Sequence, residues 1–209
     1  MDKAPAWSPD GEWIAFSSDR TGSFDLWRVR PDGLDAHRLT SHPGTEKLPA
    51  WSPDGRKLAF AGIRDGNTDV YVLDLDTKVE TRVTTQRFAD CYATWSPDGR
   101  RLAYAAQSVT DFDIVAWDVA SGQSVPLTRT PVDEAFPVWS PDGERLAYQF
   151  ETSRGTWAIA VAGANGSNAA PLIASTGWDT KPAWRPTDVV SVAEEGRRLP
   201  AMLGALKRP

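Results

Sequence analysis

Short apolar runs alternate with polar turns along the chain. Residues 13–16 and 58–60 are runs of consecutive apolar residues, and segments rich in proline, aspartate, glycine and serine separate such runs. Continuous apolar runs of this length, bounded by turn residues, are typical of strands that are covered on both faces. We therefore predict an all-β fold in which short antiparallel strands are joined by tight turns.

The pattern repeats with a fixed period. The segment Trp-Ser-Pro-Asp-Gly recurs every 44 residues, and a fifth copy begins 45 residues after the fourth but continues as Arg-Pro-Thr-Asp. The five copies begin at Trp7, Trp51, Trp95, Trp139 and Trp184. A period of 40 to 45 residues is typical of propeller blades. We predict a β-propeller of four-stranded antiparallel blades, with four complete 44-residue repeats plus the start of a fifth.

The repeats also predict the domain organisation and the core. One propeller domain should cover residues 1–186, followed by a non-repeat tail over residues 187–209. No blade can bury its apolar faces alone, so we predict that the five repeat tryptophans are structural core residues between stacked blades. In the tail, residues 199, 202, 203 and 206 would form one apolar helical stripe. The tail is therefore either a short helix that caps the last blade or a frayed terminus.

The number of repeats leaves the closure of the ring open. Propellers usually have four to eight blades. The chain is therefore part of a larger propeller, or assembles with a second chain, or closes alone as a four-bladed ring. Because an open end would expose a blade face, we expect self-association that completes the propeller.

The repeat sequence resembles a known family. Pro-x-Trp-Ser-Pro-Asp-Gly followed by Ile/Leu-Ala-Phe/Tyr, as in residues 49–60, is similar to the PD40 (TolB-like) type of WD40-like repeat. The resemblance covers about residues 1–186 and implies a non-enzymatic binding or scaffold module in a bacterial, periplasmic cell-envelope complex. The same repeats occur in propellers of prolyl-oligopeptidase-like peptidases, tricorn-like proteases and sugar-acid lyases, so the resemblance specifies the repeat and not the function.

An acid stands five residues before each repeat tryptophan. These acids are Asp2, Glu46, Asp90, Glu134 and Asp179. If the Pro-x-Trp strand is innermost, they should form a ring around one mouth of the central channel. Converging carboxylates would attract a protein or peptide partner with a basic segment, or calcium or another divalent cation, although we expect no cofactor. The alternative is that each acid accepts backbone hydrogen bonds at a blade junction.

Other candidate chemistry is sparse. Aspartates at positions 25, 69 and 113 also recur at 44 residues, but they lack the pattern of a calcium loop, so we interpret them as turn-stabilising. His37 and His42 have no third ligand beside them, and no nucleophile elbow or P-loop is present. We predict no metal site, no catalytic residue and no enzyme activity. The alternative is a propeller associated with an enzyme, either a peptidase or a metal-dependent lyase-like or lactonase-like site at the acidic ring.

Net charge and hydropathy argue against two classes of partner, nucleic acid and membrane. The net charge of −5 and the lack of basic clusters argue against nucleic acid. No run of about 18 apolar residues occurs, so we expect no membrane insertion. The single cysteine, Cys91, forms no internal disulfide and is interpreted as structural. The chain as written starts directly in the first repeat, which predicts no secretory leader and a cytoplasmic location, whereas the family resemblance implies the periplasm.

Overall fold

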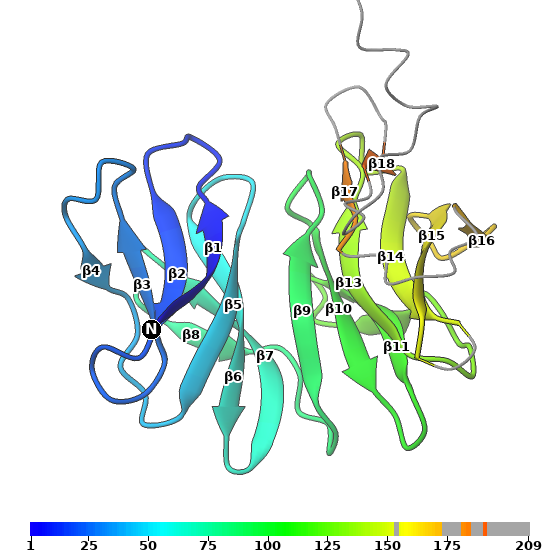
Figure 1. Cartoon of the computed structure of the whole chain (residues 1–209), viewed down its shortest axis with the longest axis horizontal. Helices are drawn as coiled ribbons and strands as arrows, with labels where there is room; N and C mark the ends of the chain where they lie inside the picture. Colours follow the sequence, from blue (N-terminus) through cyan, green and yellow to red (C-terminus); the bar gives the residue numbers. More distant parts are fainter. Residues whose placement is uncertain (153–154, 173–180, 185–189, 192–209) are drawn as a thin grey trace, which may run out of the picture.

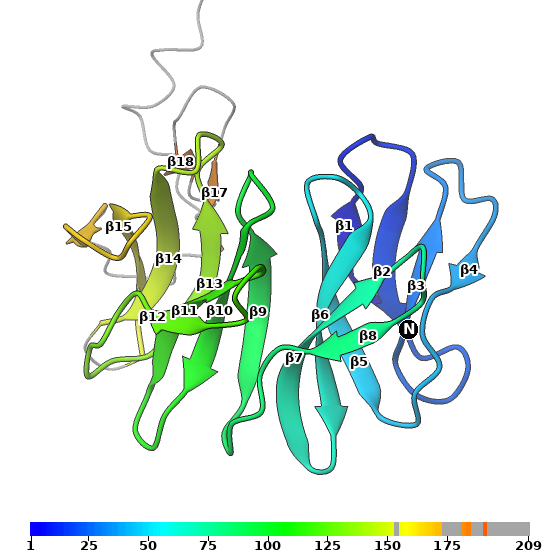
Figure 2. The ribbon, with the colours of Figure 1, turned by 180° about the vertical axis from the view of Figure 1, so that it is seen from behind.

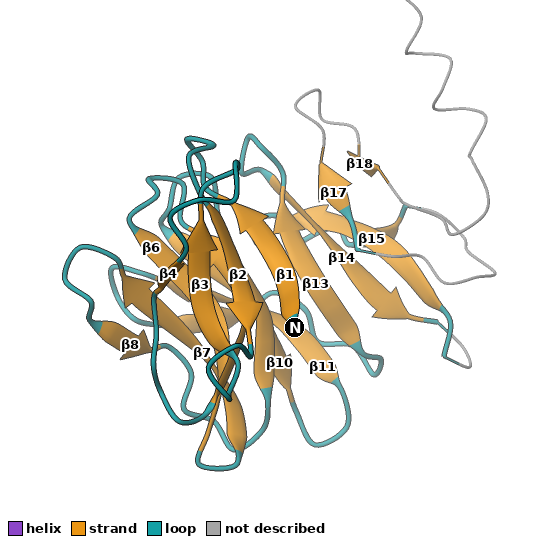
Figure 3. Cartoon of the chain, turned by 60° about the vertical axis from the view of Figure 1, so that its left-hand side comes forward, coloured by secondary structure: helices purple, strands orange, loops and turns teal. Residues whose placement is uncertain are grey.

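The computed structural model describes residues 1–152, 155–172, 181–184 and 190–191, and all regular structure in these ranges is β-strand (Figure 3). The strands form four four-stranded antiparallel sheets and one two-stranded sheet. The four larger sheets stand side by side in chain order (Figure 1), as the reverse view in Figure 2 also shows. The predicted all-β propeller with four complete blades is therefore confirmed. The described ranges contain no helix that is long and apolar enough to cross a membrane.

Within each blade the strands pair in chain order, so the first strand forms one edge of the sheet. Blade 1 consists of β1 (Asp2–Trp7), β2 (Ile14–Ser18), β3 (Asp25–Val29) and β4 (His37–Arg38). Blade 2 consists of β5 (Thr45–Trp51), β6 (Lys57–Arg64), β7 (Asn67–Asp74) and β8 (Glu80–Arg82). Blade 3 consists of β9 (Asp90–Trp95), β10 (Arg101–Gln107), β11 (Phe112–Asp118) and β12 (Ser124–Pro126). Blade 4 consists of β13 (Glu134–Trp139), β14 (Arg145–Glu151), β15 (Trp157–Gly163) and β16 (Ala170–Pro171).

The first strands of successive blades contact one another, β1 with β5, β5 with β9 and β9 with β13. They are therefore the inner strands of the array. A further inner strand, β17 (Ala183–Trp184), contacts β13 and pairs with β18 (Val190–Ser191). This pair is the start of the fifth unit, and β18 lies in the segment predicted to be a non-repeat tail. The predicted helical stripe at residues 199–206 lies outside the described residues.

The repeated Ser-Pro-Asp-Gly segment is the turn between the inner strand and the second strand. In blade 3 the Ser96 hydroxyl donates to Asp98 Oδ1 at 2.6 Å and accepts from the backbone N–H of Arg101 at 2.9 Å. Gly99 has a φ of +69°, a conformation that costs an L-residue with a side chain about 1 kcal/mol. The serine and aspartate side chains thus form the hydrogen bonds that stabilise the turn, which explains why the motif recurs in every blade.

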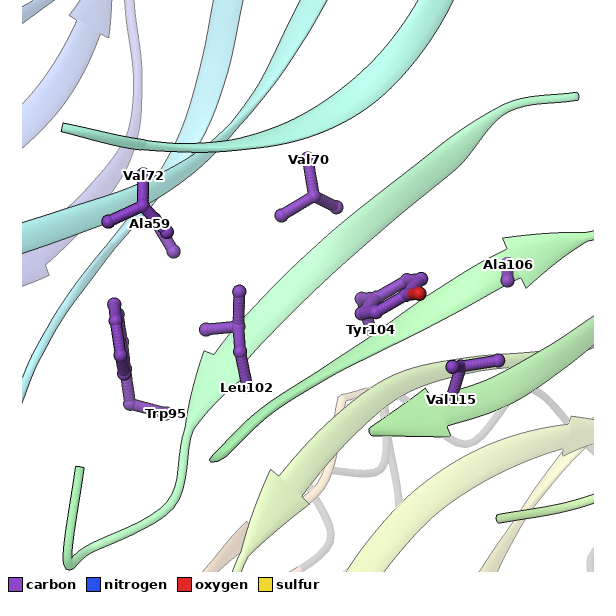
Figure 4. Packing of buried hydrophobic residues seen from close by; sticks show 8 residues of the cluster. All are labelled: Ala59, Val70, Val72, Trp95, Leu102, Tyr104, Ala106 and Val115. Atoms are coloured by element: carbon purple, nitrogen blue, oxygen red, sulfur yellow. The ribbon is translucent and has the colours of Figure 1, made fainter. Parts of the chain in front are cut away.

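Each blade has two different faces. The large face of a blade carries the repeat tryptophan with leucine and aromatic side chains, and the small face carries alanine and short aliphatic side chains. Between blades 2 and 3, Trp95, Leu102 and Tyr104 of the large face pack against the small face formed by Ala59, Val70 and Val72 (Figure 4). The same packing of a large face on the preceding small face recurs at the other junctions. Burial of these apolar surfaces stabilises the array.

Three of the repeat tryptophans also bind the preceding blade through their indole N–H groups, whereas the indole nitrogen of Trp139 has no hydrogen-bond partner among the described residues. Trp51 donates to the carbonyl of Ala6 at 3.0 Å, and Trp95 and Trp184 make the corresponding bonds to Ala50 and Val138. Trp95 and Trp139 are buried, and Trp51 and Trp184 are half-buried. The prediction that all five are core residues is wrong for Trp7, whose surface is 60% exposed because no preceding blade covers it.

Candidate functional site

Each inner strand contains a β-bulge at the same place in the repeat. The pairing of β5 with β6 shifts between Lys47 and Ala50, so that the inner strand holds one residue more than its partner, and β1, β9 and β13 shift in the same way. The bulge residue has a positive φ in all four strands, namely Ala4, Leu48, Tyr92 and Phe136 at 51°, 59°, 58° and 51°. This conformation is costly for residues other than glycine, so the surrounding sheet must hold it.

The bulge turns these side chains to one shared cavity of about 230 Å³ between the inner strands. We call the residues at this position the channel wall, and Lys181, three residues before Trp184, belongs to it: Ala4, Leu48, Tyr92, Phe136 and Lys181. The residues that follow the bulge complete the lining, and three of them are Pro5, Pro49 and Pro137. Proline is tolerated here because the bulge leaves its position outside the hydrogen-bond ladder.

Two aromatic rings and one cation of the channel wall lie in contact with one another. The rings of Tyr92 and Phe136 lie in contact, with centroids 3.9 Å apart. The ammonium of Lys181 lies 4.7 Å from the centroid of Phe136, within the range of a cation–π interaction. Sequence reasoning missed these residues. The available signal was the position three residues before each tryptophan, which varies in residue type, whereas the next position is proline in four of the five repeats.

The structure places the sequence-predicted acids differently from the expected ring. Glu46, Asp90 and Glu134 lie at or next to the start of their inner strands, as predicted, but they are 0%, 0% and 1% exposed. Asp2 is exposed and forms an ion pair of 3.0 Å with Arg20, and Asp179 lies outside the described residues. The three buried carboxylates therefore do not form a solvent-facing ring around a channel mouth.

The buried acids lie at successive blade junctions, beside a threonine of the preceding blade. The threonine hydroxyls accept hydrogen bonds from backbone N–H groups at 2.9, 3.0 and 2.8 Å; the three threonines are Thr40, Thr84 and Thr128. Each threonine also lowers the pKa of the neighbouring acid, and the Thr84 hydroxyl donates to Asp69 Oδ1 at 3.4 Å. The acids lie at blade junctions, as the alternative predicted, but in these hydrogen bonds the threonine, and not the acid, accepts the backbone N–H. The sequence period located these residues in the strand but carried no information on the direction of their side chains.

The three buried acids differ in their electrostatic surroundings. Burial raises the pKa of Glu46 above its ordinary value, although Thr40 and Arg64, whose guanidinium lies 2.5 Å away, oppose the rise. Burial and the Asp69 carboxylate raise the pKa of Asp90 to about 6. Within the described ranges neither oxygen of Asp90 has a hydrogen bond of normal geometry. Burial and Asp113 raise the pKa of Glu134, which accepts from Thr130 at 3.1 Å.

The recurring aspartates before the third strands are also structural. Asp25 pairs with Arg38 at 2.8 Å and Asp69 pairs with Arg82 at 2.7 Å. Asp113 accepts from the backbone N–H of Thr130 at 3.1 Å. Each carboxylate ties the start of a third strand to a later part of the same repeat. No group of three histidine, cysteine or acidic residues among the described residues is arranged to hold a metal ion.

Cys91 is half-buried beside the acid of the third repeat. Burial and the adjacent Asp90 raise the pKa of its thiol to about 12. A thiol nucleophile requires a lowered pKa, so Cys91 stays protonated and unreactive at neutral pH.

Residues 1–188 match the family model described as the TolB beta propeller domain, PD40. The chain belongs to this family. Among solved structures it is similar to TolB from Acinetobacter baumannii, with 25% identity and a TM-score of 0.79, covering 90% of this chain and 47% of that one. A putative TolB from Agrobacterium tumefaciens is 24% identical with a TM-score of 0.76, covering 83% of this chain and 65% of that one. The chain thus spans about half to two thirds of the length of these TolB structures.

Two further similarities show the limits of inference from this fold. An oligogalacturonate lyase in complex with manganese has a TM-score of 0.69 at 18% identity, covering 92% of this chain and 58% of that chain, which shows the shared fold alone. The uncharacterized protein Atu1656 of Agrobacterium fabrum is 56% identical over 36 residues, which are 17% of this chain and 12% of that protein. Because enzymes and TolB proteins share the architecture, function must be argued from the site.

Proposed function

We propose that this protein is a binding module that holds a segment of a protein or peptide partner at the channel wall, and that it carries no catalytic machinery of its own. The observation that supports the proposal is the convergence of five repeat-equivalent side chains on one cavity. A cavity lined mostly by apolar and aromatic groups, with few polar groups, is typical of ligand sites. The strained bulges hold these side chains in place before a partner arrives, which reduces the entropy lost on binding.

The chemistry of the wall changes the expected partner. The sequence suggested a basic segment, but the acids of the inner strands are buried and a lysine lines the cavity. We propose a segment with an apolar or aromatic side chain for Tyr92 and Phe136, and a carboxylate for Lys181.

On the basis of the family, we also propose that this binding serves a bacterial cell-envelope complex. We propose that the protein is located in the periplasm. The alternative, a propeller associated with an enzyme, stays a prediction. The resemblance to an oligogalacturonate lyase concerns the fold, and the buried acids are arranged as junction residues.

Selection from a phage-displayed library of random short peptides would test the proposal. We expect enriched peptides with aromatic and acidic residues, and we expect Tyr92→Ala with Phe136→Ala to weaken their binding at least about tenfold. Val79→Ala, at an exposed position in the turn before β8, is the matched control and should bind normally. Lys181→Gln should weaken only the acidic peptides. Equal binding to the double variant and the unmodified chain would refute the channel wall as the site.

A further inference from the structure

A second cavity lies at the junction of blades 2 and 3, at the end of the blades where the inner strands begin. Its volume is about 550 Å³, which is in the range of small-ligand sites. Blade 3 contributes most of the lining, including Ala106 and Val115 from the face that it turns toward blade 2 (Figure 4). The connection that precedes β9 contributes Gln86 and Phe88. We call this space the junction cavity.

Blades 1 and 2 carry larger groups at positions that line the junction cavity in blade 3. Three lining residues of blade 3 are smaller than their counterparts 44 positions earlier in blade 2. The pairs are Arg64 and Ser108, Tyr71 and Val115, and Arg82 and Pro126. Blade 1 has two arginines and a tryptophan at the same positions. Blade 3 therefore lacks two guanidinium groups and one aromatic ring, and the junction cavity lies where those groups occur in the other two blades.

The two arginines of blade 2 neutralise acids of the same blade. Arg64 contacts Glu46 and, at 2.6 Å, Glu80. Arg82 pairs with Asp69 at 2.7 Å. Because Glu46 is fully buried, the first contact shows that a guanidinium on an aliphatic stem reaches an acid at this depth. A buried carboxylate without such a partner is costly.

Blade 3 retains two of these acids without the cations. The counterparts of Glu46 and Asp69 are Asp90 and Asp113. Ala106 is the ladder partner of both, so the three side chains lie in one row on the same face of the blade, and Ala106 and Asp113 line the cavity. Asp90 is fully buried, and among the described residues neither of its carboxylate oxygens has a hydrogen bond of normal geometry. The exposed Arg129 also lines the cavity, but in the described part of the chain it forms no ion pair with either acid.

We propose that the junction cavity binds a ligand with a guanidinium group on an apolar stem, such as an arginine, and that Asp113 and Asp90 are its anionic partners. The planar guanidinium has N–H donors in fixed directions, so it can contact two carboxylates at once, as Arg64 does in blade 2. Phe88 and Val115 provide apolar cover for the stem. The junction cavity shares no lining residue with the cavity at the channel wall, so this inference does not depend on the proposed function.

Titration of the isotope-labelled full chain with N-acetyl-arginine amide, followed by NMR, tests the proposal. We expect saturable chemical-shift changes at the backbone amides of Ala106, Ser108 and Val115. N-acetyl-citrulline amide has nearly the same shape without the charge, and it should bind at least about tenfold more weakly. The same arginine within a short glycine peptide distinguishes two sources of the ligand. Tighter binding of the peptide indicates a polypeptide segment, and equal binding indicates a free small molecule.

Three variants of the cavity and one control locate the site. Asp90→Asn and Asp113→Asn keep the size of the side chain but remove its charge, and each should weaken binding at least about tenfold. Ser108→Arg supplies the guanidinium that Arg64 provides in blade 2, so it should occupy the cavity and abolish binding of the ligand. Val79→Arg adds the same charge at an exposed position of blade 2 and should bind normally.

Loss of binding in the three cavity variants, with folded NMR spectra and with normal binding to the control, supports the proposal. Shift changes that do not saturate, equal affinity for the citrulline compound, or undiminished binding to Ser108→Arg overturns it.

Discussion

The junction between blades 1 and 2 and the junction between blades 2 and 3 have the same architecture but a different charge balance. In the first, the buried Glu46 faces Arg64 across 2.5 Å, and Arg64 also contacts Glu80 at 2.6 Å. In the second, the buried Asp90 has Thr84 and the carboxylate of Asp69 as neighbours. The compensating cation lies 18 residues after the acid in the first junction. The equivalent residue of the next repeat is Ser108, which explains the missing cation.

This difference shows that the buried acid recurs in each repeat, whereas the cation that pairs with it does not. The acid occupies the same strand position in each blade, but its charge depends on a hairpin residue that varies from arginine at 20 and 64 to serine at 108 and threonine at 152. Burying a carboxylate without a counter-ion costs several kcal/mol unless the group takes up a proton. Burial raises the pKa of both acids, but a cation opposes the rise only at Glu46, so we expect the larger pH dependence at the second junction.

Arg64→Met should give the largest effect, because it makes the first junction resemble the second. Methionine keeps apolar cover over Phe60 and Tyr71 but leaves Glu46 without a counter-ion, so we expect the free energy of unfolding to fall by about 3 kcal/mol at neutral pH. Urea unfolding at several pH values measures it. The loss should shrink at acidic pH, as Glu46 becomes protonated.

A double variant provides the control for this prediction. Adding Glu46→Gln to Arg64→Met removes the uncompensated charge and should restore most of the stability. If the double variant is as unstable as the sum of the two single variants, the packing of the arginine, and not its charge, stabilises the junction.

Asp90→Asn should stabilise the protein at neutral pH. Burial raises the pKa of Asp90 from 3.8 to about 6, so the folded state binds a proton more tightly than the unfolded state does. The stability of the unmodified chain should therefore fall as pH rises from about 4 to about 6, and the Asp90→Asn variant avoids this loss because its amide does not titrate. We expect a gain of about 3 kcal/mol above pH 6, since a pKa shift of one unit corresponds to about 1.4 kcal/mol.

Denaturant unfolding at both ends of that range measures the effect of Asp90→Asn. Asp111→Asn, in the exposed hairpin of the same blade, is the control, because the pKa of Asp111 is lowered by hydrogen bonds from Ser108 and Thr110 and the substitution should not stabilise. An Asp90→Asn variant whose advantage is independent of pH would mean that Asp90 does not titrate in the folded protein as described.

Thr40→Val and Thr84→Val should give the smallest effects. Each removes a hydroxyl that accepts a backbone N–H bond, from Leu26 at 2.9 Å or Val70 at 3.0 Å, which costs about 1 kcal/mol. The second substitution should cost more at neutral pH, because Arg64 remains beside Glu46 but no cation pairs with Asp90. Equal losses at pH 7 in thermal unfolding would contradict the proposed difference between the junctions.

The repeat could be predicted from the sequence because its signals are local. Ser96, Asp98 and Gly99 complete a turn within a few residues, so the motif itself specifies the chain reversal. The short apolar runs likewise become strands covered on both faces. The period then predicts stacking, and with it the burial of Trp95 and Trp139.

The candidate site could not be predicted in the same way. The channel wall depends on a bulge, and only the paired strand reveals that Leu48 or Tyr92 is the extra residue. The burial of the Glu46 and Asp90 side chains depends on packing between successive blades, which the sequence of one repeat does not show. The exposure of Trp7 depends on its place at the end of the array, although its sequence context equals that of the buried copies.

The bulge in each inner strand separates the residues that a blade needs for folding from the residue that lines the channel. Leu58 and Tyr104 cannot change without disturbing a neighbouring blade, whereas the bulge residue touches the shared cavity and is already different in every repeat. The five channel-wall residues, one per repeat, can therefore be substituted while the blades that carry them keep their packing. Variation at these positions would yield a family of pockets of unlike specificity from a single architecture, much as loops do on other scaffolds.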